Sequence, residues 1–150
     1  MRLAILMIGL FTSFSLWAEP RITHDVIIDL LEKEKQFLQA RDATSISNLF
    51  TDDTVLVMPD GKRLNKNEYM LETVRMFMNT EAILRKHELI QEEISENGLS
   101  AEIQVKSVDR YLFVRGSQKK AVTSVSTWNA TIVMEDGVAK YKHGEIIHLD

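Results

Sequence analysis

The sequence predicts one α+β domain in which a curved antiparallel sheet wraps around three N-terminal helices. Apolar residues recur at helical spacing in the first half of the chain, and from Glu81 onward the period changes to two, the period of a strand. Asn97-Gly98 and Asp136-Gly137 are strong signals for tight hairpin turns, and a looser turn contains Gly116. These turns divide residues 81–150 into four long strands that follow one another as a meander.

Three amphipathic helices are predicted before the long strands. The first covers residues 23–40 with Thr23 as its N-cap, and the second starts at Asp42. The third begins with a capping box at Asn65-Lys66-Asn67-Glu68, after a short hairpin within residues 54–64. The helical positions expected to be buried are Ile27, Leu30, Leu31, Phe37, Leu38, Ile46, Leu49, Phe50, Met70, Val74 and Phe77.

Tight turns also fix which residues lie opposite one another in the sheet. Strand side chains alternate between two faces, so the register assigns each residue to the inner or the outer face. Without bulges, the pairs that bear on function are Ile94 with Ala101, Glu88 with Ser107, Lys86 with Asp109, Ser107 with Ser126, Asp109 with Ser124, Val105 with Trp128, Ile132 with Tyr141, Ala130 with His143, and Trp128 with Glu145. At Gly144, inside the last strand, a bulge or a close backbone approach is expected.

The inner face assigned in this way is apolar but has ionisable and hydroxyl groups at its centre. Such groups are costly inside a protein unless they are paired or hydrated. We therefore expect an open cavity with a polar floor and aromatic walls. The central polar residues are Lys86, Glu88, Ser107, Asp109, Ser124, Ser126, His143 and Glu145. The residues predicted to line a ligand pocket are Ser107, Tyr111, Ser124, Ser126, Trp128 and Tyr141.

Three ionisable residues of this face are candidates for catalysis. Asp109 is either a general base, or an acid that donates to an oxyanion, or the partner of Lys86 in an ion pair. His143 and Glu145 form either an oriented acid–base pair or a hydrogen-bonded pair without chemistry. No metal is expected, because His148 faces away from His143, and no cofactor is expected, because the sequence has no glycine-rich phosphate loop.

The composition excludes several classes of protein. With 150 residues, 45% of them hydrophobic and 27% charged, the chain has the size and balance of one globular domain. Its net charge of −4 argues against a nucleic-acid partner. The absence of cysteine excludes disulfides, thiol nucleophiles and thiolate zinc sites.

Residues 1–18 have the layout of a secretory signal peptide. Arg2 provides a positive start, an apolar run follows, and Ala18 precedes the expected cleavage site. The alternative is a transmembrane anchor, which needs about 20 apolar residues, more than this run contains. The expected mature domain, residues 19–150, is periplasmic or secreted and has no membrane contact after cleavage.

Two segments resemble the nuclear transport factor 2-like superfamily, whose fold is cone-shaped. They are Leu49-Phe50-Thr51-Asp52-Asp53-Thr54-Val55 with Met58-Pro59-Asp60-Gly61, and the closing strand Tyr141-Lys142-His143-Gly144-Glu145-Ile146-Ile147-His148. The resemblance covers about residues 22–150. The superfamily includes ketosteroid isomerases, SnoaL-like polyketide cyclases, limonene epoxide hydrolases and many uncharacterised secreted proteins, so the resemblance implies a fold rather than one activity. The helical tyrosine of the isomerases has no clear match, because the first helix offers Phe37.

The leading hypothesis is a domain that binds a small apolar or amphipathic molecule in the cavity. One alternative is an enzyme that resembles the isomerases or cyclases and transfers protons through Asp109 or through His143 and Glu145. The other is a protein-interaction module whose cavity has no function. A homodimer is also expected, through apolar residues on the outer face of the sheet. These residues are Leu89, Val108, Leu112, Val125 and Ile146.

Overall fold

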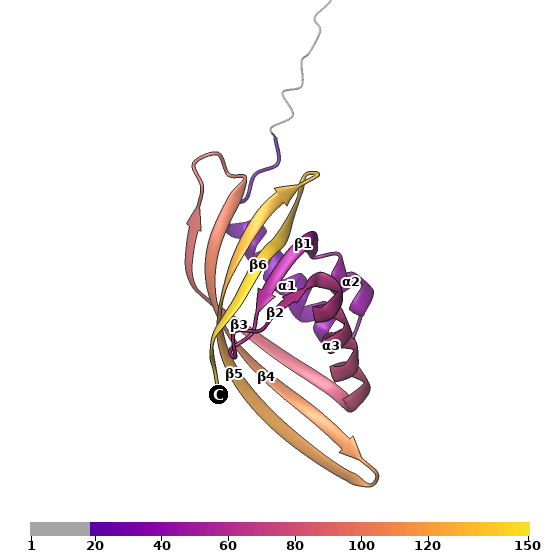
Figure 1. Cartoon of the computed structure of the whole chain (residues 1–150). Helices are drawn as coiled ribbons and strands as arrows, with labels where there is room; N and C mark the ends of the chain where they lie inside the picture. The colour runs from indigo at the N-terminus through magenta and orange to yellow at the C-terminus, as the bar shows by residue number, and fades with distance from the viewer. Residues whose placement is uncertain (1–18) are drawn as a thin grey trace, which may run out of the picture.

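The computed structural model describes residues 19–150, which form a curved sheet with three helices on its concave face (Figure 1). The sheet has six strands in the order β2-β1-β6-β5-β4-β3. The predicted fold class, α+β with a curved sheet around three N-terminal helices, is therefore confirmed. The predicted signal peptide, residues 1–18, lies outside the described residues.

Each helix begins at a residue that the sequence marks as a cap. The helices are α1 (His24–Ala40), α2 (Ala43–Ser47) and α3 (Lys66–Asn79). Thr23 caps α1 and Asp42 caps α2 by accepting a hydrogen bond from a backbone amide of the first turn. Asn65 and Glu68 form the expected capping box at the start of α3.

The strands form one meander with a short hairpin added at its edge. They are β1 (Phe50–Val57), β2 (Arg63–Asn65), β3 (Thr80–Ile94), β4 (Ser100–Arg115), β5 (Gln118–Glu135) and β6 (Val138–Leu149). The four long strands pair antiparallel, as predicted. The pair β1–β6 is parallel, so the sheet is not antiparallel throughout. These two strands are far apart in the sequence, so no hairpin turn sets their relative direction.

The central pair of long strands, β4 and β5, has the predicted register throughout. The confirmed pairs are Val105 with Trp128, Ser107 with Ser126, and Asp109 with Ser124. Arg115 pairs with Gln118, so the turn at Gly116 is tighter than expected, but it leaves the register unchanged. The tip of this hairpin extends past the helices (Figure 1).

A β-bulge at Ile90 interrupts the predicted register of β3. Between the turn and the bulge the pairing is as expected, with Ile94 opposite Ala101. Beyond the bulge, Leu89 lies opposite Val105, the position expected for Ile90, because the bulge leaves Ile90 unpaired.

The inner face predicted for β3 is wrong between Ala82 and the bulge, because a shift of one residue turns every side chain there to the other face. Leu89, expected on the outer face, now packs against the core. Lys86 and Glu88, expected on the inner face, are exposed. The corrected inner pairs are Arg85 with Asp109 and His87 with Ser107.

Two further bulges, at Lys142 and Ile147, change the faces of β6 in the same way. The pairs on the inner face are Ile132 with Tyr141, as predicted, then Gly144 with Ala130 and Ile146 with Trp128, in place of His143 and Glu145. The close approach expected at Gly144 is present: a Cβ atom there would lie 2.6 Å from Cδ2 of Leu56. A side chain at this position would displace Leu56.

The helices bury their apolar stripes against the inner face of the sheet. Among the positions predicted to be buried, Val74 is 39% exposed, because Thr73 and Phe77 are the residues of α3 that are buried. Leu49 and Phe50 are buried as predicted, but they lie beyond the end of α2. Among the described residues, no helix combines the length and the apolar character needed to cross a membrane.

Candidate functional site

Glu34 is a buried carboxylate on the inner stripe of α1. It follows Leu30 and Leu31 at helical spacing, at a position where another apolar residue is the usual choice. Its side chain is only 9% exposed. A carboxylate in such a position requires partners that compensate its charge.

Arg85 of β3 compensates two carboxylates at once. Its Nε and Nη2 donate to the two carboxylate oxygens of Asp109, each over 2.6 Å, in a bidentate pair. Its Nη1 donates to Oε1 of Glu34 over 2.5 Å. Burial works against the charge of Arg85, but Glu34 and Asp109 outweigh it and raise the pKa of the guanidinium. We call these three residues the buried charge cluster.

The second oxygen of Glu34 has only distant partners. The Tyr141 hydroxyl donates to Oε2 over 3.4 Å, which is long for a hydrogen bond. Nε2 of His87 lies 3.5 Å from the same oxygen. This nitrogen is buried and has no hydrogen-bond partner among the described residues. Oε2 is therefore the acceptor of the buried charge cluster with the most unused capacity.

A chain of hydrogen bonds joins His87 to Trp128. Nε1 of Trp128 donates to Oγ of Ser107 over 2.8 Å, and Oγ in turn lies 2.9 Å from Nδ1 of His87. Because the indole fills one acceptor position, the Ser107 hydroxyl is free to donate to Nδ1, which would leave the proton of a neutral ring on Nε2, toward Glu34. Burial lowers the pKa of His87, although Glu34 opposes this effect.

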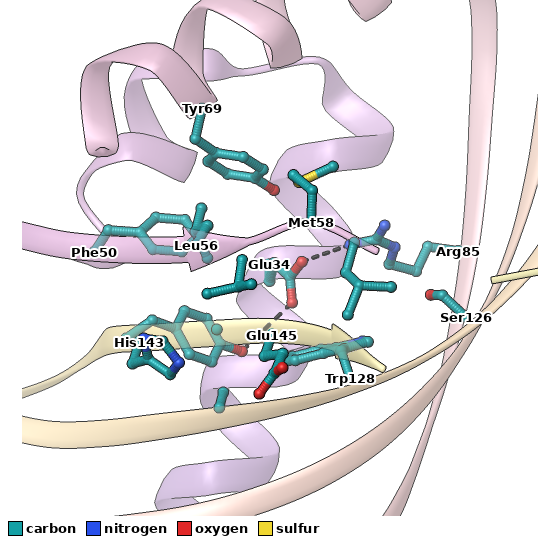
Figure 2. Close-up of a pocket in the computed structure, with 15 residues that line it drawn as sticks. Glu34, Phe50, Leu56, Met58, Tyr69, Arg85, Ser126, Trp128, His143 and Glu145 are labelled. Carbon is teal, nitrogen blue, oxygen red and sulfur yellow. Dashed lines mark hydrogen bonds and ion pairs between the residues drawn. The ribbon is translucent and has the colours of Figure 1, made fainter. Parts of the chain in front are cut away.

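A pocket of about 120 Å³ reaches this cluster (Figure 2). Figure 2 shows the Glu34 carboxylate at the centre of the residues that line it. They are Glu34, Phe50, Leu56, Val57, Met58, Tyr69, Arg85, Ser126, Trp128, Ala130, Tyr141, His143, Gly144, Glu145 and Ile146. The walls are mainly apolar and aromatic. Of the buried charge cluster, Glu34 and Arg85 line the pocket.

Four aromatic rings of the pocket lie in a continuous series. The ring centroids are 5.4 Å apart for Tyr69 and Phe50, 5.3 Å for Phe50 and Tyr141, and 6.0 Å for Tyr141 and Trp128. Burial and the negative charge of Glu34 raise the pKa of both tyrosine hydroxyls. Both tyrosines are therefore neutral hydrogen-bonding groups at physiological pH. We call these four residues the aromatic cage.

The six residues predicted to line a ligand pocket fall into two groups. Ser126, Trp128 and Tyr141 line the pocket, whereas Ser107, Tyr111 and Ser124 flank Asp109 or His87. The hydroxyl of Tyr111 donates to Oδ2 of Asp109 over 3.1 Å. Burial, followed by the charge of Asp109, raises the pKa of Tyr111 to about 12.

Asp109 is buried on the inner face, as predicted, and it forms an ion pair. The partner is Arg85 and not Lys86, because the bulge at Ile90 shifts β3 by one residue. Both oxygens of Asp109 are occupied, and it does not line the pocket.

His143 and Glu145 border the pocket from the opposite side of β6. Their partners on β5, Thr131 and Asn129, form hydrogen bonds with side chains of β4 on the outer face. Glu145 is exposed, and no hydrogen bond within residues 19–150 joins it to His143. The structure therefore does not bring these two residues together with Asp109, as a register without bulges would have required.

Four polar residues of the site, Glu34, Tyr69, Arg85 and His87, are absent from the predicted set. Glu34 carries a signal that could have found it, since it is a charge inside an apolar helical stripe. Tyr69 also carries one, since it is a tyrosine in an amphipathic helix, here α3 and not the first helix. Arg85 and His87 carry none, because only the bulge turns them inward.

Among residues 19–150, no group of three or more His, Asp and Glu residues could hold a metal ion. No protein-family model matches the sequence, and no curated protein matches it.

Solved structures resemble this one closely in fold but not in sequence. The fold is similar to a putative scytalone dehydratase from Novosphingobium aromaticivorans, with a TM-score of 0.71, 11% identity, and coverage of 84% of this chain and 85% of that chain. A hexachlorocyclohexane dehydrochlorinase matches with a TM-score of 0.68, 11% identity, and coverage of 84% and 86%. A nuclear transport factor 2-like protein of unknown function from Shewanella oneidensis matches with a TM-score of 0.61, 12% identity, and coverage of 81% and 96%. The chain has the nuclear transport factor 2-like fold.

Proposed function

We propose that this protein is a small-molecule-binding domain whose ligand enters the pocket and contacts the aromatic cage. The observation that carries the proposal is an apolar, aromatic pocket that ends on a buried charge cluster. Apolar walls with a few convergent polar groups are the usual architecture of ligand sites. A cavity of about 150 Å³ is known to bind benzene, so about 120 Å³ suits a body close to one ring.

The direct test is native mass spectrometry of the protein purified from its own host, with a search for a retained small molecule. Trp128→Ala removes one wall of the aromatic cage and should abolish retention, whereas Trp128→Phe keeps an aromatic wall and should preserve it. A wild-type protein that retains nothing and binds no ring-sized probe would contradict the proposal.

A second candidate is an enzyme that moves a proton through Glu34. Glu34 is the buried carboxylate among the residues that line the pocket, and its Oε2 lies 3.5 Å from Nε2 of His87. A carboxylate within reach of a bound molecule is a suitable general base. Two proteins of similar fold are named as a dehydratase and a dehydrochlorinase, enzymes that remove water and hydrogen chloride. Asp109 is less suited, because Arg85 and Tyr111 occupy its oxygens.

The two candidates differ in what Glu34→Gln removes. In an enzyme this change should abolish turnover of a substrate while the substrate still binds. In a binding domain it should change affinity only. Glu32→Gln is the matched control, because it makes the same change of charge on the exposed side of α1, away from the residues that line the pocket, and should leave turnover unchanged.

We also propose that the protein is exported and forms a homodimer. The signal-like segment of residues 1–18 supports export. On the outer face, half-buried Val108 and Val125 lie opposite each other, and Leu84 is 57% exposed on the neighbouring strand. Leu89 and Ile146 no longer belong to this surface, since the bulges turn them inward. Val125→Glu should shift a dimer to monomer in sedimentation analysis, and a wild-type monomer would refute the dimer.

A further inference from the structure

The buried charge cluster is not neutral. Two carboxylates, Glu34 and Asp109, share the single guanidinium of Arg85, which leaves one formal negative charge inside the domain. His87, whose Nε2 lies 3.5 Å from Oε2 of Glu34, could carry a compensating positive charge, but burial lowers its pKa and favours its neutral form. Lys35, the other cation besides Arg85 whose charge acts on His87, pairs with Glu32 at the protein surface. The described residues therefore leave this charge only partly compensated.

The uncompensated charge faces the pocket. Both oxygens of Asp109 accept hydrogen bonds from Arg85 or Tyr111, and Asp109 does not line the pocket. Glu34 does line it, and its Oε2 has only two long contacts, 3.4 Å to the Tyr141 hydroxyl and 3.5 Å to Nε2 of His87. A carboxylate oxygen accepts about two hydrogen bonds, so Oε2 has room for a donor from a ligand.

The aromatic cage independently favours a positively charged ligand. Aromatic faces attract cations, and clusters of such rings are a common device for binding organic ammonium groups. Here the cage includes Tyr141, which contacts Oε2 of Glu34, so the rings and the carboxylate meet at one end of the pocket. Arg85 does not reverse this preference for a cation, because three of its N–H groups already donate hydrogen bonds to the two carboxylates.

We propose that the ligand of this pocket is an organic ammonium ion with an apolar body of about one ring, held by Glu34 and the aromatic cage. This inference rests on the proposed binding function and names its ligand class. The ammonium would donate to Oε2 of Glu34 and balance the charge of the cluster. A carboxylate ligand would place a third negative charge beside Glu34 and Asp109 and should be excluded.

The test compares four probes of nearly equal size: benzylammonium, benzyl alcohol, ethylbenzene and benzoate. Their affinities for the wild-type protein are measured by calorimetry at neutral pH. Benzylammonium should bind at least about tenfold more tightly than ethylbenzene, because a hydrogen bond to a charged group adds to the apolar contact. Benzyl alcohol should lie between them, and benzoate should not bind.

Glu34→Gln should bring the affinity ratio of benzylammonium to ethylbenzene close to one while the affinity for ethylbenzene stays within about twofold. Glu32→Gln is the matched control: it makes the same change of charge on the exposed side of α1 and should keep the ratio of the wild type. Because the wild-type series needs no mutation, the inference remains testable even where Glu34→Gln fails to fold.

The outcomes separate the inference from the proposed function. If ethylbenzene binds but benzylammonium binds no more tightly, or if benzoate binds best, the ammonium inference is wrong and the binding function stands. If Glu34→Gln folds and keeps the ratio, the preference comes from elsewhere and the inference is also wrong. If none of the four probes binds, the proposed function itself fails.

Discussion

The two buried carboxylates of this protein meet the same arginine but have different surroundings. Asp109 lies on the inner face of β4, where Arg85 and Tyr111 satisfy both of its oxygens. Glu34 lies on α1 at the pocket, where one oxygen has a short bond and the other only contacts of 3.4 Å and 3.5 Å. Burial is similar, at 4% and 7% of each residue exposed. Unused acceptor capacity, and not burial, distinguishes the carboxylate that can serve a ligand from the one that holds the fold.

The largest expected effect is the loss of the shared cation. Arg85→Met should lower the free energy of unfolding by about 3–5 kcal/mol, because it leaves two buried carboxylates without their partner. The neighbouring change Lys86→Met should alter it by less than about 0.5 kcal/mol, because Lys86 is exposed. Urea unfolding measures both. Equal effects would contradict the pairing of Arg85 with Asp109 in the register of β3.

A smaller difference is expected between the two carboxylates themselves. Asp109→Asn should cost about 2–3 kcal/mol of stability, because it weakens three hydrogen bonds to a charged group. Glu34→Gln should cost only about 1 kcal/mol, because it weakens one short hydrogen bond and one long one. Thermal and urea unfolding of the two variants measure this contrast. A greater cost for Glu34→Gln would reverse the roles assigned to the two sites.

The pH dependence of stability tests the Glu34 side of the cluster. Because burial lowers the pKa of His87 below its usual value of 6.5, the unfolded chain binds a proton more readily than the native protein. Stability should therefore fall as the pH drops below about 6.5, by no more than the effect of one proton. His87→Gln should flatten this part of the curve, and His143→Gln serves as the control for loss of an imidazole. An unchanged curve for His87→Gln would contradict the buried neutral ring.

The smallest expected effect concerns the hydroxyl of Tyr111. Tyr111→Phe removes one donor to Asp109, which keeps its bidentate bond to Arg85, so the loss should be below about 1 kcal/mol. Urea unfolding measures it, with Tyr111→Leu as the comparison that also removes the ring. A loss of several kcal/mol would mean that Asp109 depends on Tyr111 as much as on Arg85.

The sequence predicts most of the fold because turns and caps are local signals. Thr23 and Asn65 mark helix starts, and the tight turn at Asp136-Gly137 begins the pairing of Ile132 with Tyr141. The register of β4 and β5 follows from the apolar pattern, because this pair lies between other strands and has one face in the core.

The site is predicted only in part because its residues come from both regular and irregular strands. Asp109 and Trp128 belong to β4 and β5, whose pairing is continuous, and both lie where expected. Arg85 and His87 lie beyond the bulge at Ile90, which has no marker such as glycine in the sequence. Missing this one extra residue shifts the predicted register by a single position, and that shift places Lys86 and Glu88 on the inner face in place of Arg85 and His87.

Ile90 has a consequence for the comparison of this chain with its relatives. Since the bulge holds one surplus residue, both halves of β3 would keep their partners on β4 if Ile90 were deleted. A homologue without the bulge would be one amino acid shorter here and could still carry the same arginine and histidine. An alignment without a gap would match Arg85 with the wrong residue of such a homologue. A gap at Ile90 is therefore needed to compare the residues of the ion pair between the two proteins.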